Sequence, residues 1–150
     1  MSNIRHKVAI LGKLPTKFKA PFDDLEYDIW AFNWHTDADK LKRIDKWFDI
    51  HRHNPNPKST IFRTSFPFQE CVQLVGGNYF NNTVSYLIAY AILEGYTEIE
   101  LYGMRFDSES EKRKLEYHNV RELMFFAKGR GIKISCPVDE PLRREYEIYG

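Results

Sequence analysis

The chain has 150 residues, with 22 Lys or Arg against 21 Asp or Glu, so its formal net charge is +1. This length predicts a single domain over residues 1–150, with a hydrophobic core that needs no disulfide or metal. The balanced charge excludes a general attraction to nucleic acid or membranes, and neither a membrane span nor a signal peptide is visible, so we expect a cytoplasmic protein.

The first half of the chain predicts four short strands separated by loops. Residues 6–13 contain an unbroken apolar run typical of a strand covered on both faces. Further strands are predicted at residues 27–34, 46–51 and 60–67. Between them we expect a short charged helix over 35–45, capped by Thr36 or Asp37, and an exposed loop over 52–59.

The second half predicts three helices and two strands. The helices are expected at 68–77, from about Thr83 to Glu94, and from about Ser108 to Lys128. The middle one is apolar on most sides, as in a buried helix. In the last one, we expect these side chains to face inward: Leu115, Val120, Leu123, Met124 and Ala127. Strands are predicted at 98–104 and, as an edge strand, at 132–138.

Alternating strands and helices indicate an α/β sandwich with a mostly parallel sheet of about six strands. Ligands in such folds bind beyond the carboxyl ends of the strands. This rule selects the segments that follow five predicted strands: 12–16, 33–35, 51–53, 63–65 and 102–106.

Several of these segments carry a family resemblance. The runs "VAILGKLPTKF", "WFDIHR", "RTSFP" and "NYFNNTVSYLIAYAILEGYTEIELYGMRF" resemble a family of small Rossmann-like proteins of tailed bacteriophages, mostly of unknown function. More distantly, the pattern is similar to bacterial sialyltransferases that use CMP-sialic acid and to motility-accessory-type glycosyltransferases. The resemblance implies a Rossmann-like three-layer sandwich, encoded by a phage and working in the host cytoplasm.

The transferase resemblance also implies site residues. In those enzymes a Gly-Asn-Gly-Pro-Ser loop after the first strand holds the nucleotide phosphates, and the matching segment here is Gly-Lys-Leu-Pro-Thr at 12–16. An asparagine after the second strand matches Asn33, and the loop before the buried helix matches at Asn82 and Thr83. Where the transferases have an acidic residue after the turn at Gly103, this chain has Arg105.

The candidate ligand-binding residues combine strand-end positions with suitable chemistry. Lys13 could balance a phosphate held by the loop backbone, and Arg63 could fork onto a phosphate or form an ion pair. The start of the helix at Thr83 could bind an anion, or Asn81, Asn82 and Thr83 could serve only as its cap. The complete set is Gly12, Lys13, Pro15, Thr16, Asn33, Arg63, Asn81, Asn82, Thr83, Tyr102 and Gly103.

The remaining polar residues favour plainer interpretations. Lys17 and the charged run 108–114 are expected to be solvated, as are Glu116 and its neighbours, and Arg105 is expected in an ion pair. His51 and His53 would point in opposite directions along a strand, so no metal site is predicted, and no cofactor. Cys71 and Cys136 are expected to be reduced core residues.

Three functions fit this sequence. The first is non-catalytic binding of a nucleotide or nucleotide-linked small molecule. The second is a reduced nucleotide-sugar-dependent transferase with His51 or His118 as acid or base, so whether the protein is an enzyme stays open. The third is an interaction subunit or homo-oligomer, marked by Tyr146 and Tyr149 of the tail.

Overall fold

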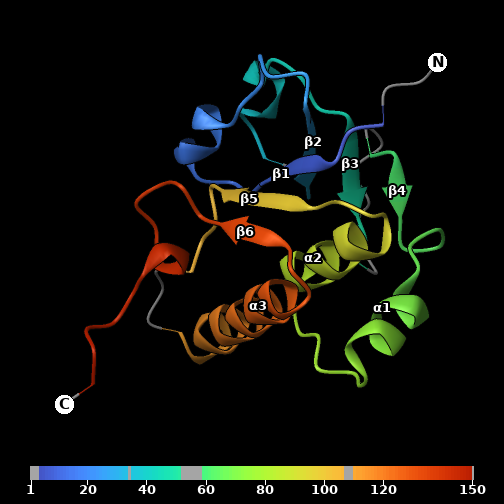
Figure 1. Cartoon of the computed structure of the whole chain (residues 1–150). Coiled ribbons are helices and arrows are strands. Elements are labelled where there is room, and N and C mark those ends of the chain that lie inside the picture. The colour runs from blue at the N-terminus through green and yellow to red at the C-terminus, as the bar shows by residue number, and fades with distance from the viewer. Residues whose placement is uncertain (1–3, 34, 52–58, 107–109, 150) are drawn as a thin grey trace.

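The protein forms a single six-stranded parallel sheet with three α-helices (Figure 1). The computed structural model describes residues 4–33, 35–51, 59–106 and 110–149. The strands are β1 Lys7–Leu11, β2 Tyr27–Phe32, β3 Lys46–Asp49, β4 Ile61–Phe62, β5 Glu98–Tyr102 and β6 Lys133–Ser135. The α-helices are α1 Phe68–Val75, α2 Thr83–Leu93 and α3 Glu111–Gly129, and short 3₁₀ helices are η1 Pro15–Lys19, η2 Ala38–Lys40 and η3 Pro141–Arg143. The predicted Rossmann-like sandwich is confirmed.

The strand order places the first strand of the chain, β1, between β2 and β5. The sheet runs β4-β3-β2-β1-β5-β6, and all five pairings are parallel. The chain first moves outward from β1 to β4, then returns through α1 and α2 to pair β5 with the other side of β1. The order therefore reverses between β1 and β5, which is where open α/β sheets bind their ligands.

The two faces of the sheet are covered differently. Figure 1 shows α1, α2 and α3 together on one side, while η1 and η2 lie on the other. The helix predicted over 35–45 is reduced to η2, because Asp37 makes no capping bond and instead accepts from Lys17. The expected third layer is thus made of 3₁₀ turns and loops rather than α-helix.

Apolar residues at helical spacing hold α2 and α3 against the sheet. Leu87, Ile88 and Ala91 of α2 are fully buried, as the apolar helix predicts. In α3 the inward face is confirmed for Val120, Leu123, Met124 and Ala127. The expectation for Leu115 is wrong: it is 61% exposed, because it lies outside the face that continues from Val120.

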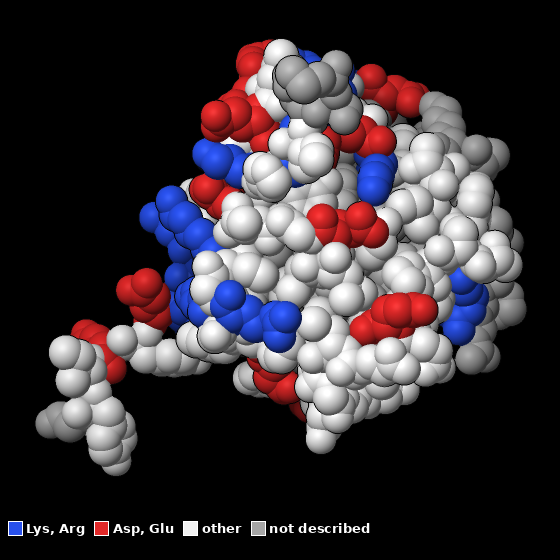
Figure 2. Space-filling model, turned by 45° about the vertical axis from the view of Figure 1, so that its right-hand side comes forward, with Lys and Arg blue, Asp and Glu red and all other residues white. Residues whose placement is uncertain are grey.

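The two cysteines are reduced core residues, as the sequence predicts. Cys71 and Cys136 are free and buried, and burial raises the pKa of the two thiols to about 12 and about 11. Figure 2 shows that basic side chains gather mainly on the left of one face, whereas acidic side chains are spread across it. No helix in the described segments is long and apolar enough to cross a membrane.

The C-terminal tail extends away from the domain (Figure 1). Tyr146 is 76% exposed, and Ile148 and Tyr149 are almost completely exposed. These residues therefore contribute little to the core of the domain.

The backbones of Gly12 and Gly103 approach each other closely, and this contact gives a prediction. A Cβ on Gly12 would lie 2.3 Å from the carbonyl oxygen of Gly103, and neither backbone can move without disturbing β1 or β5. Gly12→Ala is expected to lower the free energy of unfolding by about 1–3 kcal/mol, measured by urea denaturation. Gly129→Ala is the control, since a Cβ there has open space, and should cost nothing. Equal stability of the Gly12 variant and the wild type would contradict this packing.

Candidate functional site

The loops after β1 and β5 are locked together by hydrogen bonds. Gly12 N donates to Tyr102 O at 2.8 Å, and Leu14 N donates to Gly103 O at 3.1 Å. Gly103 N donates to the hydroxyl of Thr16 at 3.1 Å, and that hydroxyl donates to Glu140 Oε2 at 2.8 Å. Gly12, Thr16, Tyr102 and Gly103 thus build the edge of the site. Because the amides of Gly12 and Leu14 are already used, the first loop offers less of a backbone phosphate cradle than the resemblance implies.

A buried polar cluster of Lys17, His35 and Asp37 packs against the first loop. Lys17 is fully buried, which overturns its expected solvation, because its Nζ finds three acceptors. It donates to Lys13 O at 3.0 Å, to His35 Nδ1 at 2.8 Å and to the carboxylate of Asp37. The cluster therefore connects the loop after β1 to the segment after β2.

The charge states of this cluster follow from its burial. Burial, followed by the charge of Lys17, lowers the pKa of His35 below its ordinary value of 6.5. The hydrogen bond from Lys17 lowers the pKa of the Asp37 carboxyl. His35 is thus neutral, with Nδ1 accepting from Lys17 and the proton on Nε2, which has no partner among the described residues.

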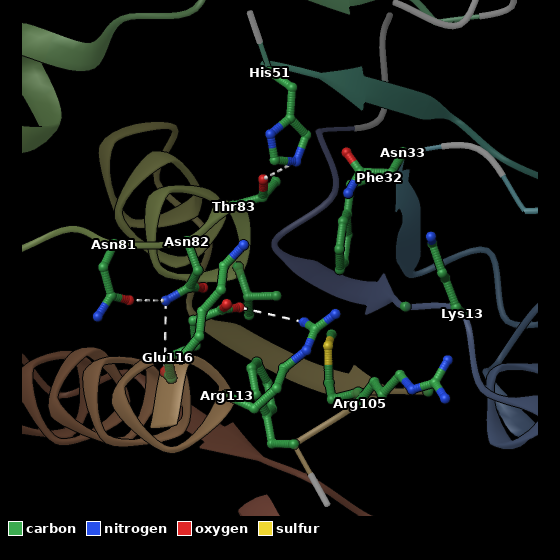
Figure 3. A pocket seen from close by; sticks show the side chains of 16 residues that line it. Lys13, Phe32, Asn33, His51, Asn81, Asn82, Thr83, Arg105, Arg113 and Glu116 are labelled. Atoms are coloured by element: carbon green, nitrogen blue, oxygen red, sulfur yellow. Dashed lines mark hydrogen bonds and ion pairs between the residues drawn. The ribbon is translucent and has the colours of Figure 1, made fainter. Parts of the chain in front are cut away.

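A pocket of about 240 Å³ opens at the carboxyl ends of β1, β2, β3 and β5 (Figure 3). Eight predicted ligand or catalytic residues line it: Gly12, Lys13, Asn33, His51, Asn81, Asn82, Thr83 and Gly103. The remaining lining residues are Phe32, Val84, Met104, Arg105, Phe106, Lys112, Arg113 and Glu116. The strand-end rule therefore located the pocket, although it did not find the contribution of α3.

Asn33 holds a fixed position at the end of β2. Its backbone adopts a left-handed φ of 58°, which asparagine tolerates better than most residues. Asn33 N donates to Phe48 O at 2.9 Å, and its own carbonyl accepts from Trp47 Nε1 at 2.7 Å. Its side-chain Oδ1 is buried and has no partner in the described chain. An acceptor in that state is available to a donor group on a ligand.

The asparagines before α2 serve the fold. Asn82 caps α2 by accepting from Ser85 N at 3.0 Å, so the capping alternative is confirmed for Asn82. Its amide nitrogen donates to Asn119 Oδ1 at 3.2 Å, and Asn81 N donates to the same oxygen at 3.1 Å. Both asparagines therefore tie the start of α2 to α3.

Thr83 and His51 form the opposite wall of the pocket. Thr83 is buried as the first residue of α2, and its hydroxyl lies 3.4 Å from His51 Nε2. The first amides of a helix have no partner within it, and the helix dipole makes this end positive. This wall therefore suits an anionic or carbonyl group on a ligand.

The start of α3 supplies residues that the sequence interpretation missed. Glu116 is 8% exposed, so its expected solvation is wrong, and its Oε2 lies 3.4 Å from Arg113 Nη1. Both lie on the face of α3 that continues to Val120 and Leu123 at spacings of three and four residues. This helical spacing could have identified both residues as part of the inward face. Their charge instead favoured an interpretation as solvated residues.

Pro15, Arg63 and His118 were predicted for the site but lie elsewhere or have other roles. Pro15 begins η1, and Arg63 donates to Ile50 O at 3.2 Å and lies over the ring of Phe68. His118 is exposed on α3 against Tyr117 and does not line the pocket. His53 lies outside the described residues. Within those residues, no three His, Cys, Asp or Glu side chains are grouped to hold a metal.

Comparison with known proteins supports the fold. No family model and no curated protein sequence matches the chain. A solved structure of the sialyltransferase CST-II, in complex with a trisaccharide acceptor and CMP, matches with a TM-score of 0.51 and 15% identity over 94% of this chain and 89% of that chain. An α-2,3-sialyltransferase from Campylobacter jejuni in apo form matches with a TM-score of 0.47 and 14% identity, over 98% and 85% of the two chains. At such identity the CST-II likeness shows a shared fold.

The buried cluster predicts a pH dependence of stability. Because the pKa of His35 is lowered on folding, the unfolded chain binds more protons as the pH falls below about 6.5. The free energy of unfolding is therefore expected to decrease from pH 7.5 to pH 5, measured by urea denaturation. His35→Asn should flatten this dependence whatever its own stability. An unchanged slope in the variant would show that His35 is not its source.

Proposed function

We propose that the protein binds a nucleotide or nucleotide-linked small molecule in the pocket formed by these strand ends. The observation that carries the proposal is the side chain of Asn33, whose buried Oδ1 has no partner among the described residues and lies at the edge of a cationic pocket. An amide in this position can recognise the hydrogen-bonding edge of a base or sugar. A neighbour with this fold has been solved with CMP and a trisaccharide acceptor, which supports the choice of ligand class.

The size of the pocket limits the ligand. Its volume of about 240 Å³ is smaller than the roughly 300–1,000 Å³ of pockets that enclose drug-sized molecules. A mononucleotide unit would fill it, and any attached sugar would extend past the exposed side chains of Lys13 and Arg105.

The arrangement favours binding without chemistry. An acid–base pair that acts on a ligand works best with a short hydrogen bond to an orienting group. Here His51 has only the 3.4 Å contact with Thr83, and Glu116 is already paired with Arg113. These contacts support retention of a ligand more than its conversion.

Removal of the Asn33 side chain tests the proposal. Asn33→Gly keeps the left-handed backbone accessible and deletes only the amide, so its stability should change little. We expect a nucleotide at about 100 times its dissociation constant to stabilise the wild type by roughly 2.7 kcal/mol. The Asn33→Gly variant should bind at least tenfold more weakly, measured by calorimetry after a thermal-shift screen of nucleotides and nucleotide sugars. Equal affinity, or no stabilisation of the wild type by any compound, would contradict the proposal.

The alternative function is a reduced nucleotide-sugar-dependent transferase, favoured by the proximity of His51 to Thr83 at the start of α2. Under this alternative, His51→Gln should reduce sugar transfer or hydrolysis at least a hundredfold, because general acid–base catalysis contributes about 10²–10⁴. His6→Gln is the matched control, since His6 is exposed just before β1, at the other end of the sheet. Activity retained in the His51 variant would remove this role, and an unmodified ligand after incubation would favour binding alone.

The exposed tail favours a third function as an interaction subunit or homo-oligomer. Tyr146, Ile148 and Tyr149 present apolar surface outside the core. Sedimentation analysis of the full chain would distinguish a monomer from an oligomer.

A further inference from the structure

Among the residues that the structure describes, cationic side chains outnumber carboxylates in the lining of the pocket. Four cationic side chains line it: Lys13 after β1, Arg105 after β5, and Lys112 and Arg113 in the first turn of α3. Within the described residues, the only carboxylate in the lining is Glu116, which lies 3.4 Å from Arg113. Lys13, Arg105 and Lys112 have no ion pair with any described residue. Among the described residues, these three cations are therefore available to an anionic ligand.

This excess distinguishes among nucleotides. A phosphate monoester carries about −1.5 to −2 at pH 7, and a second phosphate in the chain adds roughly one further charge. A monophosphate would pair with only part of this group of cations. A diphosphate would match it.

The positions of the cations also suit an extended group. Figure 3 shows Arg113 reaching into the pocket from α3, with Arg105 and Lys13 along one side. The contact between Arg113 and Glu116 orients the guanidinium of Arg113 without using all five of its N–H donors. Cations from three segments can contact successive phosphates, and an arginine can fork onto one of them.

The backbone of the first loop also favours recognition of phosphate by side chains. In loops that cradle phosphate, a series of free amides points at the ligand. Here the amides of Gly12 and Leu14 bond to Tyr102 and Gly103. These two amides are therefore not available to a phosphate, and the side chains of Lys13 and Arg105 are the cationic groups at this edge.

We propose that the ligand is a nucleoside diphosphate or a molecule linked to one, with the diphosphate held between Lys13 and Arg113. This inference rests on the proposed nucleotide-binding function and names the class of ligand. Since the contacts are ionic, the affinity should fall as salt is raised.

The test is calorimetric titration of the full-length protein with nucleoside mono- and diphosphates of each base, at low salt and with EDTA present. For the base that binds, the diphosphate is expected to bind at least tenfold more tightly than the monophosphate, and inorganic pyrophosphate should compete with it. Arg113→Gln and Lys13→Gln should each reduce this ratio at least threefold, while Arg113→Lys should preserve most of it. Lys114→Gln is the matched control, because Lys114 is an exposed cation of α3 outside the pocket lining.

The outcomes separate this inference from the proposed function. Equal affinity for mono- and diphosphates would overturn the diphosphate assignment and leave nucleotide binding in place. A preference that survives in both glutamine variants would also overturn it, because the charges named here would not be its source. If no nucleotide binds, the proposed function fails and the inference fails with it. Circular dichroism of each variant checks that lost binding is not lost folding.

Discussion

The contact between the loops after β1 and β5 controls the geometry of the site. Gly12 and Gly103 approach so closely that no side chain fits between them, and their amides bond across the two segments. The contact fixes where the chain leaves the two central strands, and it consumes backbone donors that would otherwise face a ligand. Lys13 directly follows Gly12, and Arg105 follows Gly103 by two residues, so the contact fixes the backbone next to both of these lining residues.

The polar cluster beneath the first loop adds a second constraint. A lysine loses solvation when buried, and Lys17 is buried only because three acceptors surround its ammonium group. One of them is the carbonyl of Lys13, so a hydrogen bond from the buried ammonium group of Lys17 holds the loop that borders the pocket. Removal of any acceptor would leave that charge partly unsatisfied, which explains why loops with little regular structure have a defined conformation here.

The sequence predicted the strands better than the site. Apolar runs such as Val8–Leu11 identify central strands because both faces of β1 are covered, and the strand-end rule then placed Asn33 and His51 at the pocket. The burial of Lys17 and Glu116 was not predicted. Lys17 depends on His35 and Asp37, which lie far away in the chain, and Glu116 depends on Arg113 in the preceding turn of α3. For Glu116 the information was present: helical spacing continues the core face of α3 toward Arg113, although the residues along it change from apolar to charged.

These features together explain how one fold can support different ligand chemistry. Where the resembled transferases have an acidic residue, Arg105 follows the Gly103 turn, and α3 adds further cations. Under the proposed function, anion recognition at this edge would depend more on long side chains and less on rigid backbone amides. Catalysis depends on donors fixed in advance at the developing charge, whereas tight binding can use side chains that close around a ligand. This difference between the two kinds of donor is the physical argument for our proposal that the pocket holds a polyanionic nucleotide without transforming it.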